Sequence, residues 1–110
     1  MVAVYDIYGF HSGEIDAIAK KLEDVLGIVW VAHDSSFIGD YYKSEGLFNE
    51  VLKLQFNYFE LEQDWMEPEF KQYSVLLYIN TSSIDQSNKI EKILLTSSTN
   101  DISLLKRKML

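Results

Sequence analysis

The two histidines are the side chains of this sequence best suited to acid–base chemistry, because imidazole titrates near neutral pH. His11 precedes Ser12, and His33 precedes Asp34. Catalysis would need one imidazole beside a nucleophile and an orienting acid, and neither histidine lies in a motif that supplies them. We expect Ser12 to cap a helix and His33 to end a strand. We therefore predict that neither histidine is catalytic.

The sequence also carries no signature of a metal or cofactor. It has no cysteine, which excludes a disulfide framework, an iron–sulfur cluster and a cysteine zinc site. The carboxylates of residues 60–69 could supply oxygen ligands, but their spacing lacks the glycine turn and final glutamate of an EF-hand. No glycine-rich phosphate-binding motif occurs. We predict a protein without catalytic residues, metal or cofactor.

The charge is distributed unevenly, with a run of carboxylates in the middle of the chain. Residues 57–70 hold five acids and no base, whereas residues 71–110 hold three acids and six bases. The acids of the run alternate with large apolar side chains, and they are Glu60, Glu62, Asp64, Glu67 and Glu69. One interpretation is a solvated acidic loop held down by Leu61, Trp65 and Phe70. The other is a partner-binding surface, in which Trp65 is an anchor and the carboxylates steer a cationic partner.

A second candidate surface follows the predicted strand at 28–33. Asp40, Tyr41 and Tyr42 combine acid and aromatic groups there, although Phe37 and one tyrosine could instead fill the core. A competing hypothesis is a small enzyme or ligand-binding domain. Its pocket would lie between the sheet and residues 35–46, with His33, Asp34 and Asp40 as polar groups.

Hydrophobic periodicity predicts the elements that position these residues. Apolar side chains recur at helical spacing over residues 14–26, and Gly27 is suited to end that helix. Residues 28–33 are nearly all apolar, which predicts a central strand covered on both faces. Residues 50–58 alternate, which predicts a strand with one wet face. The other expected elements are strands at 2–8 and 73–79, a loop or short irregular strand at 37–46, a helix from Ser83 to about Leu95, and a tail at 101–108 that favours strand over helix.

This order of elements predicts an α+β fold for a single domain spanning residues 1–110. We expect a two-layer sandwich, with a mainly antiparallel sheet of four to five strands and two helices on one face. The formal net charge of −7 disfavours binding to nucleic acid or to an anionic membrane surface. No basic leader or long apolar stretch is visible, so we expect a cytoplasmic protein.

Three segments carry a resemblance to a known class of proteins. They are Leu26-Gly27-Ile28, then Ser35-Ser36-Phe37-Ile38-Gly39-Asp40-Tyr41-Tyr42, and, after the acidic loop, Tyr73-Ser74-Val75-Leu76-Leu77-Tyr78-Ile79. Over residues 1–95 the chain resembles the small bacterial immunity proteins of polymorphic-toxin and contact-dependent growth inhibition systems. The resemblance implies a noncatalytic protein that binds a cognate toxin domain, commonly a basic nuclease, and blocks it. Under this hypothesis the five carboxylates of 60–69 pair with toxin lysines and arginines, and Trp65 with Tyr41 or Tyr42 anchors the complex.

Overall fold

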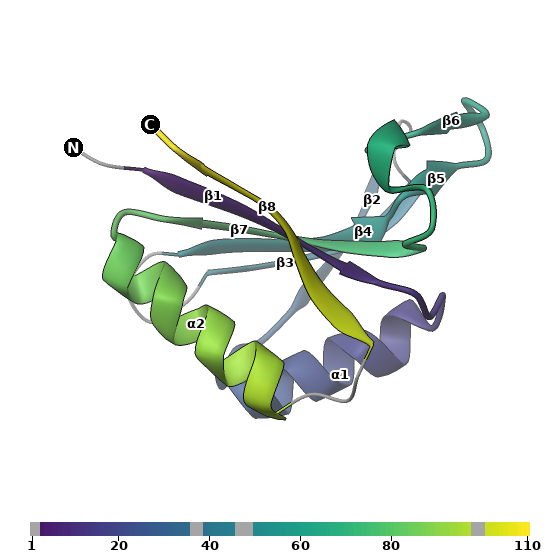
Figure 1. Ribbon diagram of the computed structural model, residues 1–110. Coiled ribbons are helices and arrows are strands. Elements are labelled where there is room, and N and C mark those ends of the chain that lie inside the picture. Colours follow the sequence, from purple (N-terminus) through teal and green to yellow (C-terminus); the bar gives the residue numbers. More distant parts are fainter. Residues whose placement is uncertain (1–2, 36–38, 46–49, 98–100) are drawn as a thin grey trace.

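Six strands form one antiparallel sheet, which the computed structural model describes over residues 3–35, 39–45, 50–97 and 101–110 (Figure 1). The strand order is β2-β3-β4-β7-β1-β8, and each neighbouring pair is antiparallel. The bounds are Val4–Phe10 for β1, Val31–Ser35 for β2, Gly39–Glu45 for β3, Val51–Phe56 for β4, Val75–Thr81 for β7 and Ile102–Met109 for β8. The predicted α+β class is confirmed, but four to five strands is too few.

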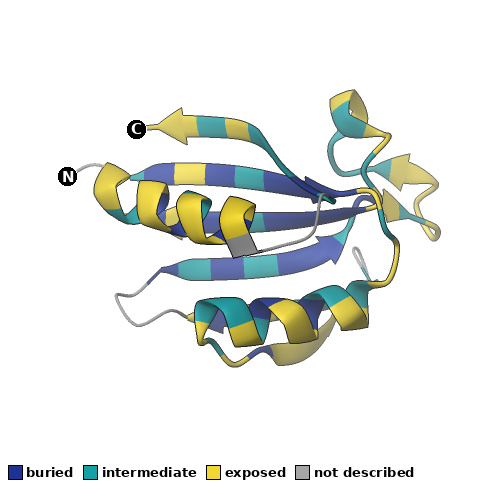
Figure 2. Cartoon of the chain, turned by 60° about the horizontal axis from the view of Figure 1, so that its bottom comes forward, coloured by how far each residue is buried: buried dark blue, intermediate teal, exposed yellow. Residues whose placement is uncertain are grey.

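Two α-helices of the described chain cover the same face of this sheet (Figure 1). They are α1, Ile15–Leu26, and α2, Ile84–Ser97. The core lies between the helices and the sheet, where β7 contributes Leu77 and Ile79 and helix α2 contributes Leu94, all with no exposed surface (Figure 2). Burying apolar side chains of this size contributes about 1.5–3 kcal/mol each. The helices are therefore held by their apolar stripes.

The ends of α1 test two predictions from the sequence. Gly27 has φ 66°, the left-handed conformation, and its N–H donates to the Glu23 carbonyl at 2.9 Å, so the predicted end of the helix is confirmed. The prediction of Ser12 as N-cap is wrong. Glu14 occupies that position, and the Ser12 hydroxyl instead accepts a hydrogen bond from the Glu14 N–H at 3.1 Å.

The predicted central strand at residues 28–33 is wrong in position and in burial. Strand β2 starts later and lies at the edge of the sheet, where Val31 is 57% exposed. Val29, just before it, is 74% exposed. Trp30 accounts for the buried part, because its indole N–H donates to the Ala19 carbonyl of α1 at 2.9 Å.

Of the two alternatives predicted for residues 37–46, the strand is confirmed for Gly39–Glu45, although β3 is longer and more regular than the short irregular strand expected. Successive side chains of β3 point to opposite faces of the sheet, so that Tyr42 packs against the core while Lys43 faces solvent. Phe37, expected in the core, lies outside the described residues. The prediction that one tyrosine packs there is confirmed by Tyr42.

Strand β4 confirms the predicted alternation, but one of its faces is drier than expected. Leu52 and Leu54 face the core. Gln55, on the face predicted to be wet, is fully buried, and so is Asn57 immediately after the strand. The tail is a strand, as predicted. Its residues pair with β1 through a register shift near Ile7.

The long connection between β4 and β7 has regular structure of its own. It contains a two-stranded hairpin of β5, Tyr58–Phe59, and β6, Asp64–Trp65, followed by the 3-10 helix η1, Pro68–Phe70. In Figure 1 the hairpin and η1 stand at one end of the sheet, away from the N- and C-termini. This end is where the acidic run is located.

Candidate functional site

Asn57 holds the connection between β4 and β7 in place. Its side-chain amide donates to the carbonyls of Phe70 and Tyr73 at 2.9 and 3.0 Å, and its side-chain oxygen accepts from the Glu67 N–H at 2.9 Å. Its backbone carbonyl also accepts from the Met66 N–H at 2.7 Å. One buried side chain therefore closes the base of the acidic hairpin, which we define as residues 58–65.

The acidic hairpin presents an apolar residue at its tip. Gln63 has φ 50° and donates its N–H to the Glu60 carbonyl at 3.3 Å, which closes a tight turn. Leu61, in that turn, is 81% exposed. It therefore does not hold the segment down, contrary to the interpretation of a tethered loop. Its exposure instead leaves an apolar side chain available to a partner at the tip of the hairpin.

Trp65 is half-buried at the base of the same hairpin. Its ring is tilted against the Tyr58 ring with centroids 5.0 Å apart, and the Lys71 amine lies 5.9 Å from its centroid. The pairing of β5 with β6 holds the two rings together, because Tyr58 and Trp65 lie directly opposite each other. The indole is a partly exposed, rigid aromatic rather than a free one, which lowers the entropy cost of using it in an interface.

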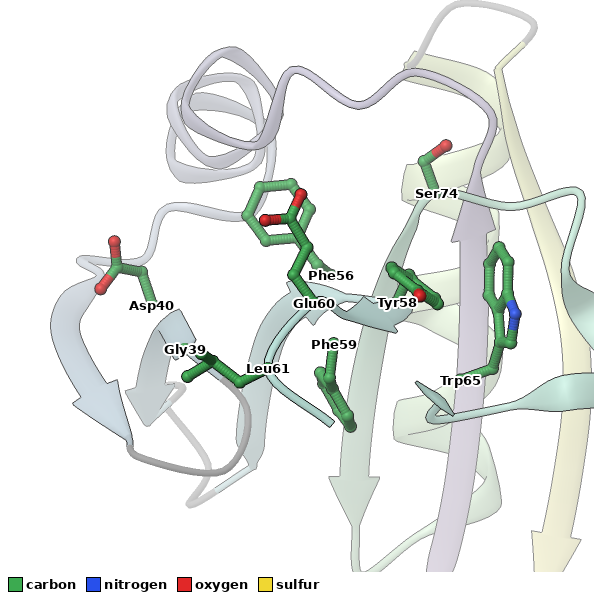
Figure 3. Close-up of a pocket in the computed structure, with 9 residues that line it drawn as sticks. All are labelled: Gly39, Asp40, Phe56, Tyr58, Phe59, Glu60, Leu61, Trp65 and Ser74. Carbon is green, nitrogen blue, oxygen red and sulfur yellow. The ribbon is translucent and has the colours of Figure 1, made fainter. Parts of the chain in front are cut away.

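A groove of about 480 Å³ separates the hairpin from the start of β3 (Figure 3). In Figure 3, Asp40 lies at one end of the groove and Trp65 at the other, with Glu60 between them. The lining residues are Gly39, Asp40, Phe56, Tyr58, Phe59, Glu60, Leu61, Trp65 and Ser74. The wall is therefore mainly aromatic and apolar, with two carboxylates. Asp40 and Glu60 come from the two separate candidate surfaces of the sequence.

The other predicted carboxylates lie outside this groove. Glu62 and Asp64 are exposed on the acidic hairpin, where Asp64 also accepts a hydrogen bond from the Trp65 N–H at 2.8 Å. Glu67 is half-buried near Tyr78, and Glu69 is 3.7 Å from the Lys106 amine. The five acids are thus spread along the hairpin and η1 and do not gather in one cluster, and we call this stretch of the surface the acidic ridge.

The two predicted tyrosines point to opposite faces of the sheet. The Tyr42 hydroxyl donates to the Asp16 carboxylate of α1, which raises the pKa of the Tyr42 hydroxyl. Tyr41 instead stacks on His33, with centroids 5.2 Å apart and an angle of 15° between the planes. Neither residue lines the groove. Tyr42 joins the sheet to a helix, and Tyr41 belongs to the helix-free face.

The residues of the alternative enzyme hypothesis do not share a pocket among those that the structure describes. Asp34 and Asp40 are register partners at the ends of β2 and β3. His33 lines a shallow depression with Lys43 and Glu45, whereas Asp40 lines the groove. The geometry therefore gives no acid–base constellation to this trio.

His11 has structural contacts. Its ring stacks on Tyr73 with centroids 4.4 Å apart, and its Nδ1 lies 3.1 Å from the Gln72 carbonyl oxygen. Its backbone N–H donates to the Asp101 carboxylate at 3.0 Å. These contacts tie the end of β1 to the connection before β7 and to the start of β8.

No three His, Asp or Glu side chains of the described residues gather in a way that could hold a metal ion. No described helix is long and apolar enough to cross a membrane. Comparison of the chain with protein-family models and with curated protein sequences found no match.

Sequence reasoning missed two residues that matter for this site. The alternation of residues 50–58 places Asn57 on the wet face, although a lone buried asparagine after a strand is a frequent organiser of turns. Leu61 is an anchor of the loop in one of the two interpretations of the acidic run. The only sequence signal for its exposure is that it lies between two glutamates, and that pattern also fits an amphipathic strand.

Proposed function

We propose that this protein is a noncatalytic, cytoplasmic immunity protein that binds a cognate toxin domain and blocks it. The toxin is a basic domain of the nuclease class, and the contact surface is the groove with the acidic hairpin beside it. The resemblance of residues 1–95 to immunity proteins supports this proposal. The structural observation that carries it is the groove itself, which joins Asp40 with Glu60 and Trp65.

The chemistry of the groove suits a cationic protein partner. Leu61 and the rim of Trp65 offer apolar contact area, and partly buried aromatics are frequent binding anchors. Asp40 and Glu60 lie on the wall, and Glu62 is exposed on the ridge nearby. Carboxylates in this arrangement attract lysine and arginine side chains and occupy positions that phosphates take on a nuclease surface. Affinity then comes from the anchors and specificity from the acids.

A rescue assay tests the function. The C-terminal domain encoded by the open reading frame immediately upstream is expressed in a sensitive cell, with and without this protein. We expect growth to be restored and a one-to-one complex to be purified. A harmless upstream product, or a toxic one that this protein does not neutralise, would refute the immunity proposal.

A charge-reversal pair tests the surface. Asp40→Lys with Glu60→Lys places two cations in the groove, and we expect at least a hundred-fold weaker complex on the basis of about 1.4 kcal/mol per ten-fold. Asp24→Lys with Asp85→Lys makes the same change of charge on exposed positions of the two helices. Equal loss in both pairs would mean that net charge alone matters and would reject the groove as the interface.

A further inference from the structure

The helix-free face of the sheet holds a further hollow, which we call the lysine depression. Its volume is about 370 Å³, and it shares no lining residue with the groove. The lining residues come from β1, β3, β4 and β7, and they are Tyr5, Lys43, Val51, Lys53, Gln55, Tyr78 and Asn80. Because Leu52 and Leu54 of β4 face the core, Lys53 and Gln55 face the opposite side.

Two lysines lie directly opposite each other in this depression. Lys43 of β3 is the register partner of Lys53 of β4, and like charges in that position repel. Within the described chain neither amine forms an ion pair, not even with Glu45, the next acid along β3. Burial first, and then Lys43, lower the pKa of Lys53. The Lys53 amine lies over the Tyr41 ring, 5.0 Å from its centroid.

Beside the lysines lies an amide without partners. Gln55 has no exposed surface, and neither its Nε2 nor its Oε1 has a hydrogen-bond partner among the described residues. Buried polar groups of native proteins are nearly always paired, and a glutamine side chain can donate two bonds and accept two. The fold therefore keeps a buried donor and acceptor next to two unneutralised cations.

We propose that the lysine depression binds a phosphate monoester of a small, hydroxyl-bearing molecule. A phosphate monoester carries a charge between −1.5 and −2 at neutral pH, which matches the two ammonium groups of Lys43 and Lys53. Lysine binds phosphate as a point charge, and the Gln55 N–H can donate to a phosphate oxygen. The Gln55 oxygen then accepts from a hydroxyl of the organic part, which lies toward Tyr5 and Tyr78.

Titration followed by backbone amide NMR tests this site. The probes are inorganic phosphate, ribose 5-phosphate and adenosine 5′-monophosphate, each against potassium chloride at matched ionic strength. We expect saturable shifts at Lys43, Lys53 and Gln55, with the organic phosphates binding more tightly than inorganic phosphate. Equal affinity for all three would refute a site for the organic part, and shifts reproduced by chloride would refute the site altogether.

Matched variants separate binding from folding. Lys43→Met with Lys53→Met should weaken binding about ten-fold or more while raising the unfolding temperature, because it removes a repulsion. Lys20→Met with Lys89→Met on the helices changes the net charge equally and should leave binding unchanged. Gln55→Leu should also raise stability yet weaken ribose 5-phosphate binding. Unchanged binding in either depression variant would overturn the proposal. Since the groove shares no residue with this site, the rescue assay is an independent result.

Discussion

At the scale of single residues, an ion pair between Asp6 and Arg107 joins β1 to the edge strand β8. Arg107 donates from Nε and Nη2 to the two Asp6 oxygens at 2.7 and 3.0 Å, and Asp6 is 1% exposed. The hydrogen bond to Asp6 raises the pKa of the Arg107 guanidinium. Further contacts to Asn88 and Glu91 extend the pair onto α2.

Breaking this pair should therefore be costly. Arg107→Met leaves a buried carboxylate without its partner, and we expect a loss of about 3 kcal/mol in the free energy of unfolding, measured by urea titration. Lys108→Met, an exposed neighbour, should change it by less than about 0.5 kcal/mol. Adding Asp6→Asn to Arg107→Met should recover part of the loss. A cost below about 1 kcal/mol for Arg107→Met alone would show that the pair is dispensable.

The buried Tyr8 hydroxyl should lower the free energy of unfolding as the pH becomes alkaline. It is fully buried, and burial is the main reason why the pKa of its hydroxyl is raised, with Asp6 adding to the effect. An unfolded tyrosine has a pKa of about 10. Because the pKa of Tyr8 is higher in the folded than in the unfolded protein, the stability gained from keeping its hydroxyl protonated is complete below about pH 10. That stability is lost as the pH rises further.

Tyr8→Phe should make this alkaline loss less steep, by up to about 1.4 kcal/mol per pH unit. The Arg107 guanidinium lies near the Tyr8 hydroxyl but donates to Asp6, and the Tyr8 hydroxyl has no hydrogen-bond partner in the described chain. We therefore expect Tyr8→Phe to be at least as stable as the parent near pH 7. Urea titrations between about pH 8 and about pH 11 measure both effects. Parallel pH profiles would exclude a role for Tyr8.

At the scale of elements, local signals predicted α1, α2, β1, β4, β7 and β8, and neighbours across the sheet decided where β2 and β3 lie. The helix stripe and Gly27 depend on residues close in sequence, so they could be found without the fold. The burial of 28–31 belongs to Ile28 and Trp30, which pack against the core before β2 begins, while Val29 points outward. Whether an apolar run is central or at an edge depends on strand order, which no local pattern records.

The connection between β4 and β7 depends on one residue, and that dependence can be tested. Asn57→Ala removes three hydrogen bonds and leaves the Tyr73 carbonyl and the Glu67 N–H without these partners, whereas the Phe70 carbonyl still accepts from the Tyr73 N–H. We expect about 1–3 kcal/mol lower stability and faster tryptic cleavage after Lys71, which is exposed in this segment. Toxin binding should weaken as well, because the groove loses its hairpin wall. Asn80→Ala, at an exposed position of β7, is the control, and equal cleavage rates would contradict the anchor role.

At the scale of the whole molecule, the candidate site is assembled from parts that the sequence keeps apart. The acids of 60–69 and the aromatics around them are visible as a composition signal, and two of the groove's residues, Glu60 and Trp65, were predicted from it. The sheet order then brings Asp40 to the same groove and sends Tyr41 to the opposite face. The lysine depression could not be predicted, since Lys43 and Lys53 meet only through strand register.

The charge of the whole molecule sets how fast it meets a basic partner. With a formal charge of −7 and an acidic ridge beside the groove, long-range attraction should accelerate association with a cationic toxin. Raising the ionic strength from about 0.01 to about 1 M shortens the screening length from about 30 to about 3 Å. We expect the association rate constant, measured by stopped flow, to fall about ten-fold or more, while the dissociation rate constant changes much less.

Two pairs of charge-reversal variants test whether the acidic hairpin is responsible for this attraction. Asp24→Lys with Asp85→Lys, on the helices, should reduce the salt dependence only through net charge, whereas Glu62→Lys with Asp64→Lys on the acidic hairpin should remove most of it. If association is slow and insensitive to salt in the parent protein, the ridge does not steer the partner. Binding would then depend on the apolar contacts of Leu61 and Trp65, and the hairpin acids would serve only to keep that surface solvated.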